Sequence, residues 1–141
     1  MFSVEVSTAP PATDGIEPGP IVFRHHLAER AQITIDTLSG GHLLHLAVAG
    51  CLFNDILRAA GQRGIAITEL QIVADGGFTG EPLLSTGVHY SVTIAGDSSD
   101  DELRELVVEC QDASAVAQSL RRGTAVTPGP VQVVAGQDGA R

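Results

Sequence analysis

The sequence predicts an α+β fold in which one long central helix is wrapped by antiparallel sheet. Three observations lead to this class. Residues 43–60 form a long apolar run with glycines before and after it. Segments that alternate apolar and polar residues lie on both sides of this run, and alternation is the period of a β-strand. After Asp100, apolar residues return at helical spacing. This order of strands and helices is typical of the α+β class.

The strands are expected before the long helix and directly after it. A loop rich in proline and glycine is predicted over residues 8–20. A short hairpin connection is predicted over 27–29, and a loop over 80–87. Alternation predicts strands at residues 2–7, 21–26, 30–36, 65–78 and 88–96.

The long helix carries start and stop signals. Ser39 or Thr37 can cap its first turn, and Gly61 and Gly64 mark its end. The helix is apolar on several faces, through Leu43, Leu44, Leu46, Val48, Leu52, Phe53, Ile56 and Leu57. Such a helix is stable when it is buried on every side, and one small sheet covers a single face. We therefore expect a homodimer, in which a second subunit covers the rest.

The C-terminal third predicts two helices and a strand. DSSDDELRELVVEC, at 97–110, begins with several possible capping residues, and a short second helix is expected over 113–123. A last strand or edge segment is expected over 124–134, and a frayed tail over 136–141. At this length, residues 1–141 are expected to form a single domain.

Composition excludes several functions. The formal net charge is −9, which disfavours binding to nucleic acid or to anionic membranes. All eight basic residues are arginine, so lysine chemistry is excluded. Residues 43–60 approach the length of a membrane span, but His45, Asn54, Asp55 and Arg58 interrupt them. We expect no membrane segment and a cytoplasmic protein whose two cysteines are reduced.

Cys51, in the middle of the long helix, is the residue most open to a chemical role. A thiol in an apolar helix is usually a small core residue. Asp55 lies one turn on, where its charge disfavours a thiolate, and Arg58 is the cation on the same face. A reactive Cys51 would therefore need an arginine from another segment. Cys110 is either a half-buried spacer or a resolving thiol for Cys51.

The remaining polar motifs favour structural roles. His42 and His45 have helical spacing but no further ligand, so hydrogen bonding in the core is expected rather than metal binding. No metal site and no bound cofactor are expected. The glycines of ADGGFTG lack the lysine and helix start of a phosphate loop, and they predict a bulge or turn.

The chain resembles the OsmC/Ohr family of osmotically inducible and organic-hydroperoxide-resistance proteins. The residues that carry the likeness are LLHLAVAGCLFNDILRAAGQRGI, ITELQIVADGGF, VHYSVTIAG and DDELRELVVECQDASAVAQSLRRGTAV. The likeness runs from about Val22 to Val126 and implies an intertwined dimer with two central helices enclosed by sheets. Active members are peroxiredoxin-like enzymes of oxidative-stress defence, which reduce organic hydroperoxides with a cysteine.

The resemblance assigns roles to individual residues. Cys51 matches the attacking cysteine, while Ser114 stands where the resolving cysteine usually lies, and Cys110 precedes it by about one helical turn. The family arginine comes from the early strands, where Arg24 and Arg30 are the candidates. The family glutamate near the helix start falls at Gly41 or His42, which cannot replace it.

Two main functions follow from these observations. The first is a thiol peroxidase in which Cys51 attacks an organic hydroperoxide, and Cys110 or an external dithiol reduces the product. The second is an OsmC-like dimer without catalysis, which binds a small apolar ligand or has a structural role. The retained Cys51 favours the first, and the missing glutamate favours the second.

Overall fold

A computed structural model describes residues 2–8, 21–35 and 38–134 of the chain. The predicted tail over 136–141 lies outside the described residues, as does the predicted loop except for Thr8, which ends the first strand.

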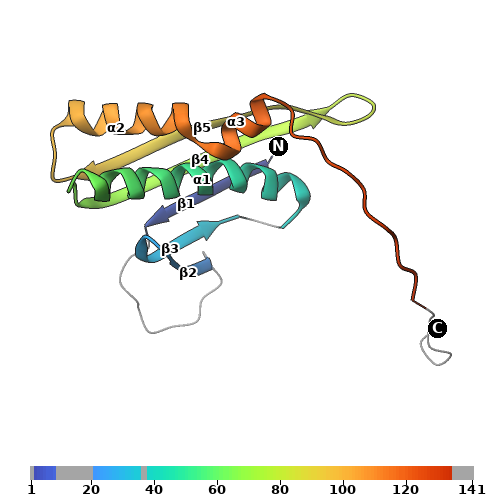
Figure 1. The fold of residues 1–141 in the computed structure, drawn as a ribbon, viewed down its shortest axis with the longest axis horizontal. Helices are drawn as coiled ribbons and strands as arrows, with labels where there is room; N and C mark the ends of the chain where they lie inside the picture. The colour runs from blue at the N-terminus through green and yellow to red at the C-terminus, as the bar shows by residue number, and fades with distance from the viewer. Residues whose placement is uncertain (1, 9–20, 36–37, 135–141) are drawn as a thin grey trace.

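Five strands form one antiparallel sheet (Figure 1). Their order across the sheet is β2-β3-β1-β4-β5. The longest pairing joins β4 to β5. The strands are β1 (Phe2–Thr8), β2 (Ile21–His25), β3 (Ala28–Thr34), β4 (Ile67–Thr79) and β5 (Leu84–Gly96).

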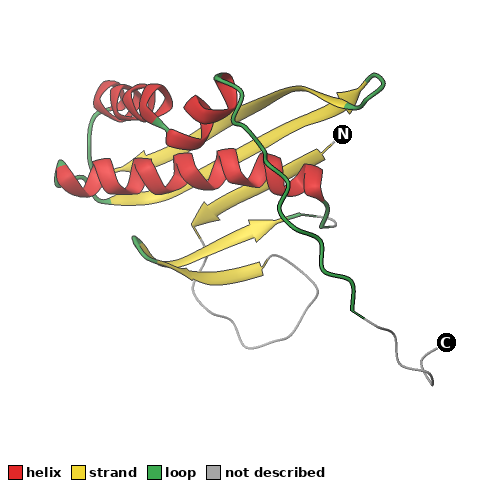
Figure 2. Ribbon diagram, turned by 45° about the vertical axis from the view of Figure 1, so that its right-hand side comes forward, coloured by secondary structure: helices red, strands yellow, loops and turns green. Residues whose placement is uncertain are grey.

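The long helix α1 (Gly40–Gln62) lies across one face of this sheet (Figure 2). Ser39 caps its first turn, because the hydroxyl of Ser39 accepts a hydrogen bond from the amide of His42. Beyond its end, Gly64 adopts a φ of 68°, a conformation that favours glycine. The buried residues between helix and sheet include Leu52, Phe53, Ile56, Val4, Val6, Leu70 and Ile72.

Two shorter helices lie beside α1 on the same side of the sheet (Figure 1). Helix α2 (Asp100–Ala113) begins at Ser99, whose hydroxyl accepts a hydrogen bond from the amide of Glu102. Helix α3 (Ala115–Arg121) follows after Ser114. The predicted α+β class, with a long helix packed on an antiparallel sheet, is confirmed.

The sequence patterns were wrong at two places. β5 begins at Leu84, so the predicted loop over 80–87 is only half as long, because the chain turns within the first residues after β4. Residues 124–134 form no strand. Pro128 and Pro130 have no amide hydrogen to donate, and this segment pairs with no neighbouring strand among the described residues. Its valines are almost fully exposed, and the chain runs away from the sheet (Figure 1).

By length and composition alone, α1 is long and apolar enough to cross a membrane. The core helix of a globular domain meets the same criterion, and Leu52, Phe53 and Ile56 of α1 are fully buried against the sheet.

Candidate functional site

Cys51 lies in the middle of α1 with a half-buried side chain. Its thiol donates a hydrogen bond to Oδ2 of Asp55 at 3.8 Å. Nη1 of Arg58 lies 3.1 Å from Oδ1 of the same carboxylate. The helical spacing predicted that these three residues share a face of the helix, and the structure confirms it.

Cys110 lies on α2 and belongs to the buried core, with 5% of its surface exposed. Burial raises the pKa of the Cys110 thiol, and the negative charges of Asp55 and Glu109 raise it further, while Arg63 acts in the opposite direction. Asp55 of α1 therefore acts electrostatically on the thiol of α2. The two cysteines are both free.

An ion pair between Arg63 and Glu109 joins the end of α1 to α2. Residue-by-residue pattern reading missed this pair, since the two residues stand 46 positions apart. The sequence carries only a weak signal for this ion pair, namely the positions of the two residues. Arg63 follows the last turn of α1, and Glu109 precedes Cys110.

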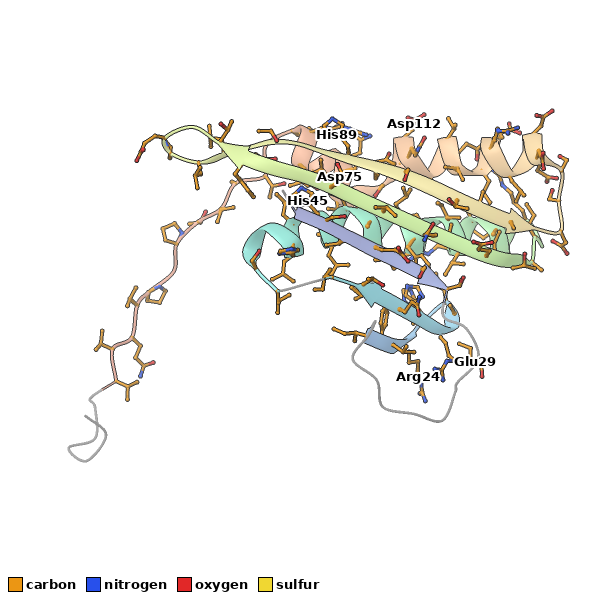
Figure 3. The ribbon with its side chains drawn as sticks, turned by 180° about the vertical axis from the view of Figure 1, so that it is seen from behind. Arg24, Glu29, His45, Asp75, His89 and Asp112 are labelled. Carbon is orange, nitrogen blue, oxygen red and sulfur yellow. The ribbon has the colours of Figure 1, made fainter. Side chains whose placement is uncertain are left out.

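The structure does not bring Arg24 to the Cys51 face of α1 within one chain. Phe23 and His25 of β2 point to the helix layer, where the His25 ring lies edge-on to Phe53 with centroids 5.2 Å apart. Because side chains alternate along a strand, the exposed Arg24 between them points to the other face of the sheet. Figure 3 shows Arg24 beside Glu29 at the β2–β3 hairpin.

Arg30 points to the same face of the sheet as Arg24, away from α1. Its neighbour Ala31 is fully buried in the core between sheet and helix, so Arg30 points away from α1. The Nε atom of Arg30 is buried and has no hydrogen-bond partner among the described residues. Within one chain, neither candidate arginine faces the layer that carries Cys51.

The other polar residues singled out in the sequence are buried. Ser114 is buried at the junction of α2 and α3. Nδ1 of His45 donates to the carbonyl of Gly41 at 2.6 Å, and Nδ1 of His42 lies 2.7 Å from the Ser39 hydroxyl. The prediction that both histidines make hydrogen bonds is confirmed. Among the described residues, no three histidine, cysteine or acidic side chains gather as a metal site would require.

A pocket of about 320 Å³ opens between α1, β5 and α3. On α1 it is lined by Leu44 and Val48. These residues and Cys51 follow one another at spacings of four and three, so they lie on the same stripe of the helix. Arg121, at the end of α3, also lines the pocket. The likeness to the OsmC/Ohr family includes this arginine in SLRRGTAV, but no local pattern placed it at a pocket, because it reaches the pocket only through the packing of α3 on α1.

Comparison with solved structures finds several distant matches, among them two OsmC-like proteins. An OsmC-like hydroperoxide resistance protein from Jannaschia sp. CCS1 is 15% identical, with a TM-score of 0.47, over 94% of this chain and 95% of that one. An OsmC-like protein of unknown function from Vibrio cholerae is 13% identical, also with a TM-score of 0.47, over 59% of this chain. The match spans 58% of the Vibrio chain.

The family comparison is more specific than these structural ones. A search of curated proteins gives no significant match. The family described as OsmC-like protein matches residues 33–128, a region that contains both cysteines and all three helices. This region is well over half of the chain, and the chain therefore belongs to the OsmC-like protein family.

Proposed function

We propose that the protein is a cysteine-based peroxidase that reduces organic hydroperoxides. The observation that carries the proposal is the position of Cys51. Its half-buried thiol donates to a carboxylate and shares a helix stripe with an apolar pocket. The Cys110 thiol lies on the neighbouring helix, within the electrostatic influence of the same carboxylate.

The reaction proceeds in two steps. The thiolate of Cys51 attacks the terminal oxygen of the hydroperoxide, the O–O bond breaks, and the alcohol leaves after protonation, with Cys51 oxidised to a sulfenic acid. A second thiol then attacks the sulfenic sulfur, and a disulfide forms with release of water. This thiol comes from Cys110 or from an external dithiol, which also restores the reduced enzyme. No bound cofactor takes part.

Asp55 has a defined part in this scheme. Its Oδ2 accepts the hydrogen bond of the Cys51 thiol and is therefore placed to receive the proton when the thiol ionises. Arg58 balances the charge of the carboxylate from the solvent side.

A homodimer completes the proposed site. Leu43 and Ala47 lie on an exposed face of α1. An apolar helix face in water is the kind of surface that a second copy covers. Because Arg24 and Arg30 of one chain point away from its own α1, the activating arginine would come from the second copy. The two reduced cysteines suit a cytoplasmic location.

The experiment that tests this function compares two serine variants at the two cysteines. With dithiothreitol as reductant, the wild type consumes cumene hydroperoxide faster than free cysteine does, and Cys51→Ser abolishes this turnover. The free energy of unfolding of Cys51→Ser changes by only about 0.5 kcal/mol, because the half-buried hydroxyl keeps Asp55 as its acceptor.

Cys110→Ser is the matched control. It costs about 1–3 kcal/mol, because a polar hydroxyl replaces a thiol that is only 5% exposed in the core. It retains the first turnover with peroxide, which a single-turnover assay measures. A wild type no faster than free cysteine refutes the peroxidase.

The second candidate is a dimer that binds a small apolar ligand without catalysis. The charged group in contact with Cys51 is a carboxylate, and within one chain neither Arg24 nor Arg30 faces this thiol. This candidate is supported if the wild type binds a ligand in the pocket but does not reduce the peroxide.

A further inference from the structure

The pocket between α1, β5 and α3 is apolar over most of its wall. One side is formed by Leu44 and Val48 of α1, and the opposite side by Ala117 and Leu120 of α3. Its floor on β5 is formed by Ser85, Gly87, Val88 and Tyr90. The volume of about 320 Å³ lies in the range of sites for small organic molecules.

Arg121 is the one charged residue that lines this pocket within the described part of the chain. It lies in the last turn of α3 and makes no salt bridge with any described residue. Arg58 and Arg63, by contrast, are paired with Asp55 and Glu109. A guanidinium without a partner beside an apolar pocket is suited to bind a carboxylate, to which it can make two parallel hydrogen bonds.

We propose that this pocket binds a medium-chain carboxylate, with the apolar chain between α1 and β5 and the carboxylate at Arg121. A cavity of about 150 Å³ holds one benzene, so a pocket twice as large holds a chain of about ten carbons. The inference does not depend on peroxide chemistry at Cys51, and the closing experiment contains no peroxide.

The charge of the pocket decides between the possible occupants. An uncharged apolar molecule or the exposed valines after α3 could cover the apolar walls equally well, but neither carries an anion that would pair with Arg121. The matched control is Arg122, which follows Arg121 directly, is exposed as Arg121 is, and does not line the pocket.

The experiment titrates the full-length protein with decanoate and with decanol in a calorimeter. The wild type binds decanoate more tightly than decanol, and Arg121→Gln weakens decanoate binding by roughly tenfold, since it removes a charge-assisted hydrogen bond. Arg122→Gln has no effect, and Arg121→Lys recovers part of the loss. Added salt weakens the binding of decanoate but not that of decanol.

Three results overturn the inference. One is equal binding of decanoate and decanol, which means an apolar site without anion recognition. Another is an equal loss in Arg121→Gln and Arg122→Gln, which means general charge attraction. The third is no binding of decanoate by the wild type; dissociation of its dimer on Leu120→Asp substitution would then mean that a second copy covers the pocket. None of these three results depends on peroxidase activity. The proposed function could therefore be refuted while this inference stands, and the reverse.

Discussion

The thiol of Cys51 lies 3.8 Å from Oδ2 of Asp55, one turn further along α1. The other oxygen of Asp55 accepts from Arg58 at 3.1 Å. The charge of Asp55 is also one of the causes that raise the pKa of the Cys110 thiol, after burial itself. A single carboxylate therefore influences both cysteines of the chain.

Replacement of this carboxylate is expected to make the Cys110 thiol more reactive. Asp55→Asn removes a negative charge that raises the pKa of Cys110. Alkylation of Cys110 by iodoacetamide, followed by mass spectrometry at constant pH, is expected to be faster than in the wild type. The control is Arg58→Gln, which keeps the charge of Asp55, so the alkylation rate of Cys110 is expected to stay close to that of the wild type. Unchanged rates in Asp55→Asn would contradict the assignment.

The stability of the protein is expected to fall in mild acid because of His25. Burial lowers the pKa of His25 in the folded chain below its ordinary value of 6.5, and the neighbouring His26 lowers it further. Between these two pKa values the unfolded chain binds more protons than the folded one, so stability is lost as the pH falls below about 6.5. Urea unfolding at about pH 7.5 and pH 5.5 measures this loss.

Two variants separate the causes of this pH dependence. His25→Gln is expected to flatten the change between the two pH values, although it also loses the ring contact with Phe53. His26→Gln removes only the weaker cause, so the dependence is expected to persist in reduced form. A wild type whose stability is the same at both pH values would refute the role of His25.

Gly76 is expected to tolerate no side chain, because β4 approaches its neighbours closely there. A Cβ at this position would overlap with the carbonyl oxygen of Gly87 and with Nε2 of His45. Gly76→Ala is expected to destabilise the protein by about 1–3 kcal/mol or more, since the clash with backbone atoms cannot relax through a side-chain rotation. Chemical denaturation measures the change.

The adjacent Gly77→Ala is the control for this clash. A Cβ at Gly77 meets only Thr86 Oγ1, at an ordinary contact distance of 3.8 Å. Its effect is expected to be much smaller. If the two alanine variants unfold at the same denaturant concentration, the close approach at Gly76 does not determine the stability of the fold.

The exposed face of α1 is expected to be a dimer interface. Ala47→Glu places a charge in the middle of this face and is expected to give a monomer in sedimentation at micromolar concentration, where the wild type sediments as a dimer. Val108→Glu on α2 introduces the same charge at another exposed apolar residue and is expected to leave the dimer intact. A wild type that sediments as a monomer would refute the interface.

Local sequence patterns determined the individual elements. The ends of α1 follow from the Ser39 cap and the glycines after it, which act through residues a few positions away. The glycines of ADGGFTG predicted a bulge, and the β4–β5 register does shift between Gly76 and Phe78. The contact of Cys51 with Asp55 was also predictable, because residues four apart on a helix are neighbours.

Relations between elements were decided by the tertiary structure. The valines of residues 124–134 resemble a strand in sequence, but a strand exists only where a neighbour pairs with its amides, and this segment has none among the described residues. Three features depend on contacts between helices that are distant in sequence. They are the effect of the Asp55 charge on the pKa of Cys110, the Arg63–Glu109 ion pair, and the pocket lined by Arg121. Their positions depend on how the helices pack side by side on the sheet. This packing minimises the apolar surface that the whole chain exposes to water, which no single segment determines.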